Sequence, residues 1–244
     1  MKLFVDTARL ADIEDALKRG FVRGVTTNPS LFAKEPKGNF NEHIGKIVEL
    51  IKQYQPDAHL SVEVFSKDPQ EILRQAETFQ ETFKHPQLSI KVPIGWDELE
   101  VIRKLSRKGF SVNCTCNMSV SQALMAAAAG ASFVSLFWGR ISDGGTKKNF
   151  AQQKNELIKK GAMKEEDFDP AYVVPAVRSL LDSSYPDTQI IVGSIRNGTD
   201  VIAAGLAGAH IVTVPPKFFP DMILHFKTDE VVGQFLKDFE NWLK

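Results

Sequence analysis

The chain has 244 residues, of which 43% are hydrophobic and 25% are charged, and its 30 basic side chains balance 30 acidic ones. This composition is that of a globular protein able to bury a large core, and a zero net charge without a long basic run argues against a nucleic acid or an anionic membrane as partner. No apolar stretch is long enough to span a bilayer, and the first apolar run, 3–5, is too short for a signal peptide, so we expect a cytoplasmic protein.

Strand-like and helix-like segments alternate from one end of the chain to the other. Short apolar and β-branched runs predict strands at 2–6, 24–28, 59–65, 88–93, 111–117, 132–138, 188–195 and 209–214. Apolar residues at helical spacing predict helices at 12–19, 40–54, 69–83, 97–107, 120–129, 199–207 and 229–243, the last of them amphipathic. The irregular interval 141–169 is expected to form an extended loop and a helix after the sixth strand, either as a surface excursion or as a lid.

This alternation indicates the fold class. About eight strands that alternate with helices favour an α/β protein of the (β/α)8 TIM-barrel type. A doubly wound sheet is the alternative, but it usually carries a glycine-rich turn after its first strand, and here that strand ends in Asp6-Thr7-Ala8. No repeat and no low-complexity linker divides the sequence, so we expect one domain over residues 1–244.

The fourth predicted strand contains a lysine within a short apolar run, Leu88-Ser89-Ile90-Lys91-Val92-Pro93. Lysine is rarely buried unless it is paired or has a chemical role, and burial favours its neutral amine. A neutral amine attacks carbonyl carbons, which is how Schiff-base lysines act. Lys91 therefore predicts covalent carbonyl chemistry inside a parallel barrel.

Polar residues spaced by two recur on other predicted strands. The sets are Thr26 with Asn28, Ser61 with Glu63, Ser89 with Lys91, Asn113 with Thr115 and Asn117, and Ser194 with Arg196. Residues two apart on a strand share a face, and most inward positions of a barrel are apolar. Because unpaired polar burial is costly, these side chains should converge on a solvated or ligand-filled site at the strand ends.

Each of these residues also has a purely structural interpretation. Asp6 has the side chain of a helix cap, and Glu63 would serve as a structural partner that neutralises Lys91. Arg140 and Arg196 would be ordinary surface salt-bridge formers. As a pair at the ends of two late strands, however, the two guanidinium groups suit a phosphate.

The only two cysteines are Cys114 and Cys116. On a regular strand they point to opposite faces, so we expect no disulfide between them. No cluster of metal-binding residues accompanies them, and the five histidines are scattered. We therefore expect two small core or near-core thiols and no metal site.

A series of short motifs runs in order along nearly the whole sequence. They are FVDTA at 4–8, GVTTNPSL at 24–31, SVEV at 61–64, IKVP at 90–93, Asn113 with Thr115 and Ser119, FVS at 133–135 with Phe137 and Gly139-Arg140, SIRN at 194–197, and GAHIVTVP at 208–215. This series resembles the small transaldolases and their relatives, the fructose-6-phosphate aldolases. The Thr-Thr-Asn-Pro-Ser element together with a lysine on the fourth strand makes the resemblance specific.

The resemblance implies a class I aldol mechanism without metal or organic cofactor. Lys91 would be the Schiff-base nucleophile, and Glu63 with Thr115 would hold the water that moves protons. Asp6 would deprotonate the substrate hydroxyl as the carbon–carbon bond breaks. The implied substrate-binding residues are Asn28, Asn113 and Ser135 for the three-carbon donor fragment, Phe137 beside them, and Arg140, Ser194 and Arg196 for the phosphate.

The resemblance also implies the partners. These are small sugar phosphates and, as in the pentameric and decameric relatives, other copies of the chain in a homo-oligomer. Transaldolase activity is favoured over simple aldol cleavage because the aldolases are expected to have Gln at position 63 and Tyr at position 137, where this chain has Glu63 and Phe137. The other hypotheses are a non-catalytic sugar-phosphate-binding barrel, based on the two arginines, and a barrel isomerase without a covalent step.

Overall fold

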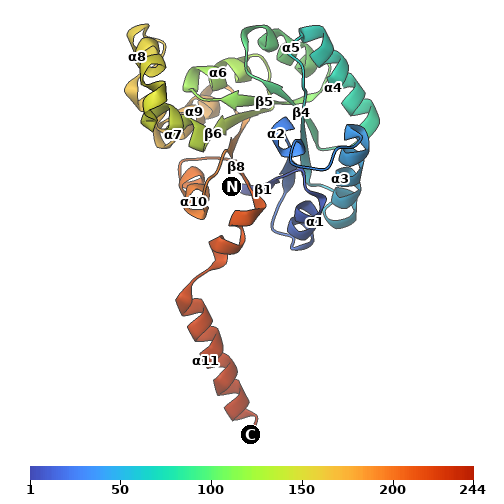
Figure 1. Ribbon diagram of the computed structural model, residues 1–244, viewed down its shortest axis with the longest axis vertical. Coiled ribbons are helices and arrows are strands. Elements are labelled where there is room, and N and C mark those ends of the chain that lie inside the picture. The colour runs from blue at the N-terminus through green and yellow to red at the C-terminus, as the bar shows by residue number, and fades with distance from the viewer.

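The computed structural model describes residues 1–244, and its eight parallel strands close into a barrel in sequence order (Figure 1). The strands are β1 (Lys2–Asp6), β2 (Gly24–Thr26), β3 (His59–Glu63), β4 (Leu88–Pro93), β5 (Ser111–Asn117), β6 (Phe133–Phe137), β7 (Gln189–Gly193) and β8 (Ile211–Val214). β8 pairs with β1 in parallel and completes the ring. The predicted (β/α)8 TIM barrel is therefore confirmed.

Most of the helices surround the barrel on its outside, and the last one projects away from it (Figure 1). They are α1 (Leu10–Lys18), α2 (Pro29–Phe32), α3 (Phe40–Tyr54), α4 (Pro69–Phe83), α5 (Trp96–Arg107), α6 (Val120–Ala128), α7 (Trp138–Thr146), α8 (Ala151–Lys159), α9 (Pro170–Ser184), α10 (Gly198–Leu206) and α11 (Phe226–Trp242), with 3₁₀ turns η1 (Lys148–Phe150), η2 (Glu165–Phe168), η3 (Pro216–Phe218) and η4 (Pro220–Ile223). None of these helices is both long and apolar enough to cross a membrane.

The main core lies between the strands and this ring of helices. On α3, for example, Ile44, Ile47, Val48 and Ile51 form one buried stripe at helical spacing. The outward-facing side chains of the strands, such as Val62 on β3, meet such stripes and are fully buried. A smaller apolar cluster is formed by Phe4, Ile191 and Ile211, with Phe133 packed against it. These side chains alternate with the outward-facing ones and occupy the lower part of the barrel interior, which leaves the carboxyl ends of the strands for polar side chains.

The segment after β6 differs from the expected extended loop. α7 begins directly at Trp138, and the interval 141–169 is mostly helical, with α8 between two 3₁₀ turns. The following helix α9 was not predicted. It contains Pro175, which removes one helical hydrogen bond, but it continues because Val173, Val174 and Val177 are buried against the core.

The last helix leaves the barrel. α11 projects away from it (Figure 1), and every residue from Lys227 to Lys244 is exposed. The helix begins and ends within three residues of the predicted 229–243 span. The amphipathic pattern predicted this helix but did not predict that it lies outside the barrel.

Candidate active site

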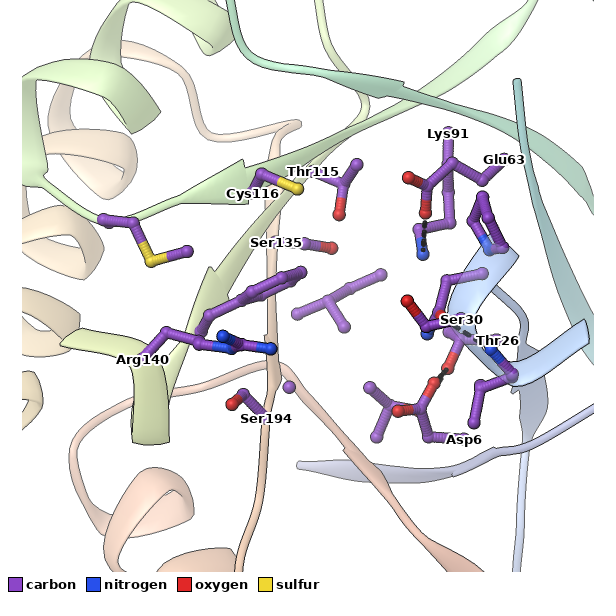
Figure 2. Close-up of a pocket in the computed structure, with 18 residues that line it drawn as sticks. Asp6, Thr26, Ser30, Glu63, Lys91, Thr115, Cys116, Ser135, Arg140 and Ser194 are labelled. Carbon is purple, nitrogen blue, oxygen red and sulfur yellow. Dashed lines mark hydrogen bonds and ion pairs between the residues drawn. The ribbon is translucent and has the colours of Figure 1, made fainter. Parts of the chain in front are cut away.

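A cavity of about 530 Å³ opens at the carboxyl ends of the strands (Figure 2). Nine of the predicted site residues line it: Asp6, Asn28, Glu63, Lys91, Thr115, Ser135, Phe137, Arg140 and Ser194. The other two, Asn113 and Arg196, do not line this cavity. Strand ends at the carboxyl face are where barrel enzymes place their sites, so the polar strand residues converge where the barrel geometry requires.

Lys91 lies in the wall of this cavity and is only 5% exposed. Its Nζ forms an ion pair with Glu63 Oε2 at 2.8 Å and donates a hydrogen bond to the Thr27 carbonyl oxygen at 2.8 Å. The parallel register of β3 and β4 places Glu63 directly beside Lys91. The buried ammonium thus has an adjacent carboxylate, which both compensates its burial and offers a place for its proton.

Asp6 stands at the end of β1, below Lys91 in Figure 2, and accepts a hydrogen bond of 2.7 Å from Thr26 Oγ1. Burial raises the pKa of the Asp6 carboxyl above its ordinary value, and the Lys91 charge and the Thr26 hydrogen bond oppose that rise. The structural interpretation of Asp6 as a helix cap is wrong, because α1 begins after Arg9 and has no side-chain cap.

Thr115 contributes a hydroxyl to the same space as Lys91 and Glu63 (Figure 2). The residue is fully buried, and its Oγ1 has no hydrogen-bond partner. An unpaired buried hydroxyl is unfavourable, so this atom is suited to bind an oxygen of a water or a substrate.

Arg140 and Ser194 mark the other end of the cavity, across from Lys91 (Figure 2). Arg140 is placed by α7, which follows β6 without a loop, and its side chain is exposed. Ser194 follows β7 with a φ of 58°. The cavity therefore has an amine at one end and a guanidinium group at the other, an arrangement suited to a molecule with a carbonyl and a distant phosphate.

Arg196 does not contribute to this end as predicted. Its guanidinium group donates paired hydrogen bonds to both carboxylate oxygens of Asp143 on α7. These bonds, together with Lys147, hold the pKa of Asp143 at about 2. For Arg196 the structure thus shows the salt bridge that was the alternative to phosphate binding. Its partner Asp143 lies 53 residues away in the sequence, too far for a local pattern to reveal it.

The two asparagines also differ from simple cavity-facing ligands. Asn28 caps α2, since its side chain accepts a hydrogen bond from the Leu31 N–H at 3.0 Å, and it also lines the cavity. Asn113 is fully buried on β5, where it contacts Ser61 and Ser135 instead of the cavity. Asn113 is linked by a hydrogen bond to Ser135, which does line the cavity.

Strand β5 breaks the regular alternation that the sequence predicted. Its register to β6 shifts between Cys114 and Asn117, and Cys116 has a φ of 63°. As a result Cys116 lines the cavity beside Thr115, while the Asn117 amide donates to the Cys114 carbonyl oxygen at 2.8 Å. The prediction that Asn117 shares the face of Thr115 is wrong. Both cysteines are free, Cys114 in the core and Cys116 half-buried beside the cavity, in line with the expected core or near-core thiols.

The sequence of the chain matches a family of known enzymes. The family model described as Transaldolase/Fructose-6-phosphate aldolase matches residues 3–243. The chain belongs to this family. Similar curated proteins, each named a probable transaldolase, come from Alkaliphilus metalliredigens (37% identical over all of both chains), Caldicellulosiruptor saccharolyticus (38% identical, 98% of this chain and 97% of the relative) and Clostridioides difficile (37% identical, 98% and 97%).

Membership of the transaldolase/fructose-6-phosphate aldolase family makes the protein an enzyme of aldol chemistry, which confirms that part of the prediction. It also confirms the family resemblance drawn from the strand motifs. No group of three or more His, Cys, Asp and Glu side chains in the structure is arranged to hold a metal ion.

Proposed function

We propose that the protein is a transaldolase of the pentose phosphate pathway. It would transfer a dihydroxyacetone unit from fructose 6-phosphate or sedoheptulose 7-phosphate to erythrose 4-phosphate or glyceraldehyde 3-phosphate. The observation that carries the proposal is the buried contact of 2.8 Å between Lys91 Nζ and Glu63 Oε2 at the cavity wall. No other lysine lines this cavity.

In the proposed first step, Lys91 gives a proton to Glu63 and its neutral Nζ attacks the ketone carbon. The new C–N bond converts the carbonyl oxygen into a hydroxyl, which leaves as water once it is protonated. Glu63 and the unpaired Thr115 hydroxyl flank Lys91 and would position the water that carries these protons. The product is an iminium ion, which acts as an electron sink.

In the proposed second step, Asp6 removes a proton from the substrate hydroxyl on the far side of the bond that breaks. The electron pair of the carbon–carbon bond moves to the iminium nitrogen, and an aldehyde leaves while the enamine stays on Lys91. The raised pKa of Asp6 suits this proton transfer and its reversal, because a carboxylate of higher pKa is a stronger base. Attack of the enamine on an acceptor aldehyde runs the same steps backwards.

The distant cavity end would hold the phosphate of the sugar. Arg140 and Ser194 line that end and would bind phosphate oxygens directly. Arg196 lies beside it but is engaged by Asp143, so we propose that it supports the phosphate site without displacing this carboxylate.

Transfer is favoured over simple cleavage by the residue that faces the enamine. Phe137 lines the cavity and has no hydroxyl to protonate the enamine carbon. The enamine would therefore persist until an acceptor aldehyde arrives. The alternative, a fructose-6-phosphate aldolase, would release the three-carbon unit instead.

Borohydride trapping tests the covalent step. With fructose 6-phosphate present, reduction should add a three-carbon unit to the peptide that contains Lys91, as measured by mass spectrometry, and Lys91→Met should prevent it and abolish activity. Lys46→Met, which removes an exposed lysine of α3 outside this cavity, is the matched control, and its Lys91 should still be labelled. An adduct on another residue, or full activity of Lys91→Met, would contradict the proposal.

The fate of the enamine is tested by measuring free dihydroxyacetone. Incubation with fructose 6-phosphate alone should release little of it, and addition of erythrose 4-phosphate should start rapid turnover to sedoheptulose 7-phosphate. Rapid release without an acceptor would instead assign the protein to the aldolases.

We also propose that the protein forms a homo-oligomer through α11. This helix presents Val231, Val232, Phe235, Leu236 and Phe239 to solvent at helical spacing. Such a large exposed apolar stripe is typical of an interaction surface. A groove of about 760 Å³ between α1 and the segment 216–223, with apolar and charged side chains in its lining, would receive the helix of another copy.

A further inference from the structure

A chain of buried hydrogen bonds crosses the barrel beneath the cavity and ends at a histidine that lies outside the site described above. It runs from Ser135 on β6 through Asn113 on β5 and Ser61 to His59, both on β3. Ser135 Oγ donates to Asn113 Oδ1 at 2.7 Å, Asn113 Nδ2 donates to Ser61 Oγ at 3.1 Å, and Ser61 Oγ lies 2.7 Å from His59 Nε2. All four residues are at most 7% exposed.

His59 is held firmly at the lower end of this chain. Its ring stacks on Phe4 at a centroid distance of 5.1 Å and meets the edge of Phe133 at 4.9 Å. Burial, with smaller effects of His85 and Lys2, lowers the pKa of His59 to about 3. The imidazole is therefore neutral at working pH, with one nitrogen that donates and one that accepts.

Only two arrangements of protons make all three hydrogen bonds of the chain. In the first, Ser135 donates to Asn113, Asn113 donates to Ser61, and the Ser61 hydroxyl donates to an unprotonated His59 Nε2. In the second, a protonated His59 Nε2 donates to Ser61, and the Asn113 amide is turned over. Ser61 then donates to the amide oxygen, and the amide nitrogen donates to Ser135. In any other combination, the Ser61 hydroxyl either has no acceptor for its one proton or would need two protons. Either outcome is unfavourable in a fully buried group.

The two arrangements differ in what Ser135 presents to the cavity. In the first, its proton is committed to Asn113, and only lone pairs face the ligand. In the second, Ser135 accepts from Asn113 and is free to donate into the cavity. Figure 2 shows the Ser135 hydroxyl directed into the cavity between Thr115 and Arg140, where either property would act on a bound molecule.

We propose that His59 is a positioning residue that acts through Ser61 and Asn113 to hold Ser135 as a hydrogen-bond acceptor for a substrate hydroxyl group. The proposal rests on the proposed function for the identity of the substrate, a polyhydroxylated sugar phosphate. The amide orientation in the structure is that of the first arrangement. It requires His59 to carry its proton on Nδ1.

His59→Phe tests the proposal because it keeps an aromatic ring between Phe4 and Phe133 but removes the acceptor for Ser61. Ser61 then has to donate to the Asn113 side-chain oxygen, which requires the amide to turn over and leaves the Ser135 proton free to donate into the cavity. We expect the KM for fructose 6-phosphate to rise by up to about tenfold, because the substrate hydroxyl then has to accept from Ser135 instead of donating to it, with kcat changed far less.

The double variant His59→Phe/Ser135→Ala separates this role from a merely structural one. Once Ser135 is removed, the chain no longer has an effect on the ligand, so the double variant should have the same KM as Ser135→Ala alone. His85 influences the pKa of His59, so His43→Phe is the matched control. It removes an imidazole that contacts the Ala8 carbonyl oxygen outside the chain, and its effect on KM should not depend on Ser135. If the KM of the double variant instead shows the product of the two single effects, the proposal is overturned.

A measurement on the unmodified protein keeps the proposal testable if His59→Phe does not fold. Nitrogen NMR of histidine-labelled protein, with His59 assigned through its contacts to the Phe4 and Phe133 rings, reports which ring nitrogen carries the proton. The expected result is a proton on Nδ1 and an unprotonated Nε2, and a protonated Nε2 in the substrate-bound protein would overturn the proposal. Borohydride trapping separates a failure of this proposal from a failure of the proposed function. If Lys91 forms the adduct but the effects of His59→Phe and Ser135→Ala on KM are independent, only the role of His59 is disproved.

Discussion

At the scale of single residues, the pKa of Asp6 is set by opposing effects of its surroundings. Burial raises the pKa of its carboxyl, whereas the nearby Lys91 charge and the Thr26 hydrogen bond lower it. Thr26 also lies within hydrogen-bond reach of Thr213, so its hydroxyl is held between two strands. The proton affinity of Asp6 is therefore set by its burial together with side chains from β2, β3 and β4.

Thr26→Val should move the acidic limb of the pH–rate profile to higher pH. Asp6 must be ionised to accept a proton, so activity falls as the pH drops through its pKa. The Thr26 hydrogen bond favours the ionised form, and its removal raises the pKa further. The measurement is kcat/KM against pH. Thr78→Val, which alters an exposed hydroxyl on α4, should leave the profile unchanged, and a limb that stays in place in Thr26→Val would contradict the assignment of this limb to Asp6.

At the scale of elements, β1 and β2 approach each other closely in the barrel interior. A Cβ atom added at Gly24 would lie 2.8 Å from three ring atoms of Phe4, which is itself 2% exposed. Glycine at this position thus lets an aromatic ring fill the lower barrel beside β2. The short β2, Gly24–Thr26, has little room to move because it pairs on both sides.

Gly24→Ala should lower the free energy of unfolding by about 1–3 kcal/mol, because the new methyl group overpacks the ring of Phe4. Chemical denaturation measures this change. Gly45→Ala in the middle of α3 is the matched control. No atom lies within 4 Å of its added methyl group, so it should raise the free energy of unfolding by up to about 1 kcal/mol through helix propensity. Equal effects of both substitutions would argue against the tight contact.

Helix α7 is the element that connects the fold to the phosphate end of the cavity. It carries Arg140 into the cavity, and its Asp143 holds Arg196 from the loop after β7. Gly139 allows this close approach, since an added Cβ would lie 2.5 Å from Arg196 Nε and 2.6 Å from the Ser194 carbonyl oxygen. The start of the irregular interval is therefore part of the site.

At the scale of the whole molecule, α11 is the feature that the isolated chain leaves unexplained. Its apolar residues extend from Phe226 to Leu243, and none of them is buried. A helix that is apolar on one face and has no partner is only marginally stable by itself. Packing into the groove beside α1 of another copy would bury this face.

Deletion of residues 226–244 should convert the oligomer into monomers. Light scattering coupled to gel filtration measures the mass, and the unmodified chain should elute as a multiple of 27.2 kDa. Phe235→Asp is a smaller change with the same expected direction, because it places a charge on the apolar stripe. Lys237→Ala on the same helix is the control and should not alter the mass. A monomeric unmodified chain would contradict the proposed assembly.

The sequence by itself determined the barrel and the position of its catalytic candidate. Alternating strand and helix periods depend on near neighbours, and the cost of a buried lysine depends on its own charge. Once the strands are known to be parallel and adjacent, Glu63 and Lys91 at corresponding strand positions are expected to meet. These inferences need no knowledge of distant contacts.

Only the tertiary structure decided how the remaining residues are used. The bulge in β5 turned Cys116 into the cavity in place of Asn117, and Asp143 engaged Arg196 across 53 residues of sequence. The path from Ser135 to His59 likewise depends on three strands that meet only when the barrel closes. The physical reason is the same in each case, since register shifts and long-range hydrogen bonds are set by the closure of the sheet and leave no local pattern in the chain.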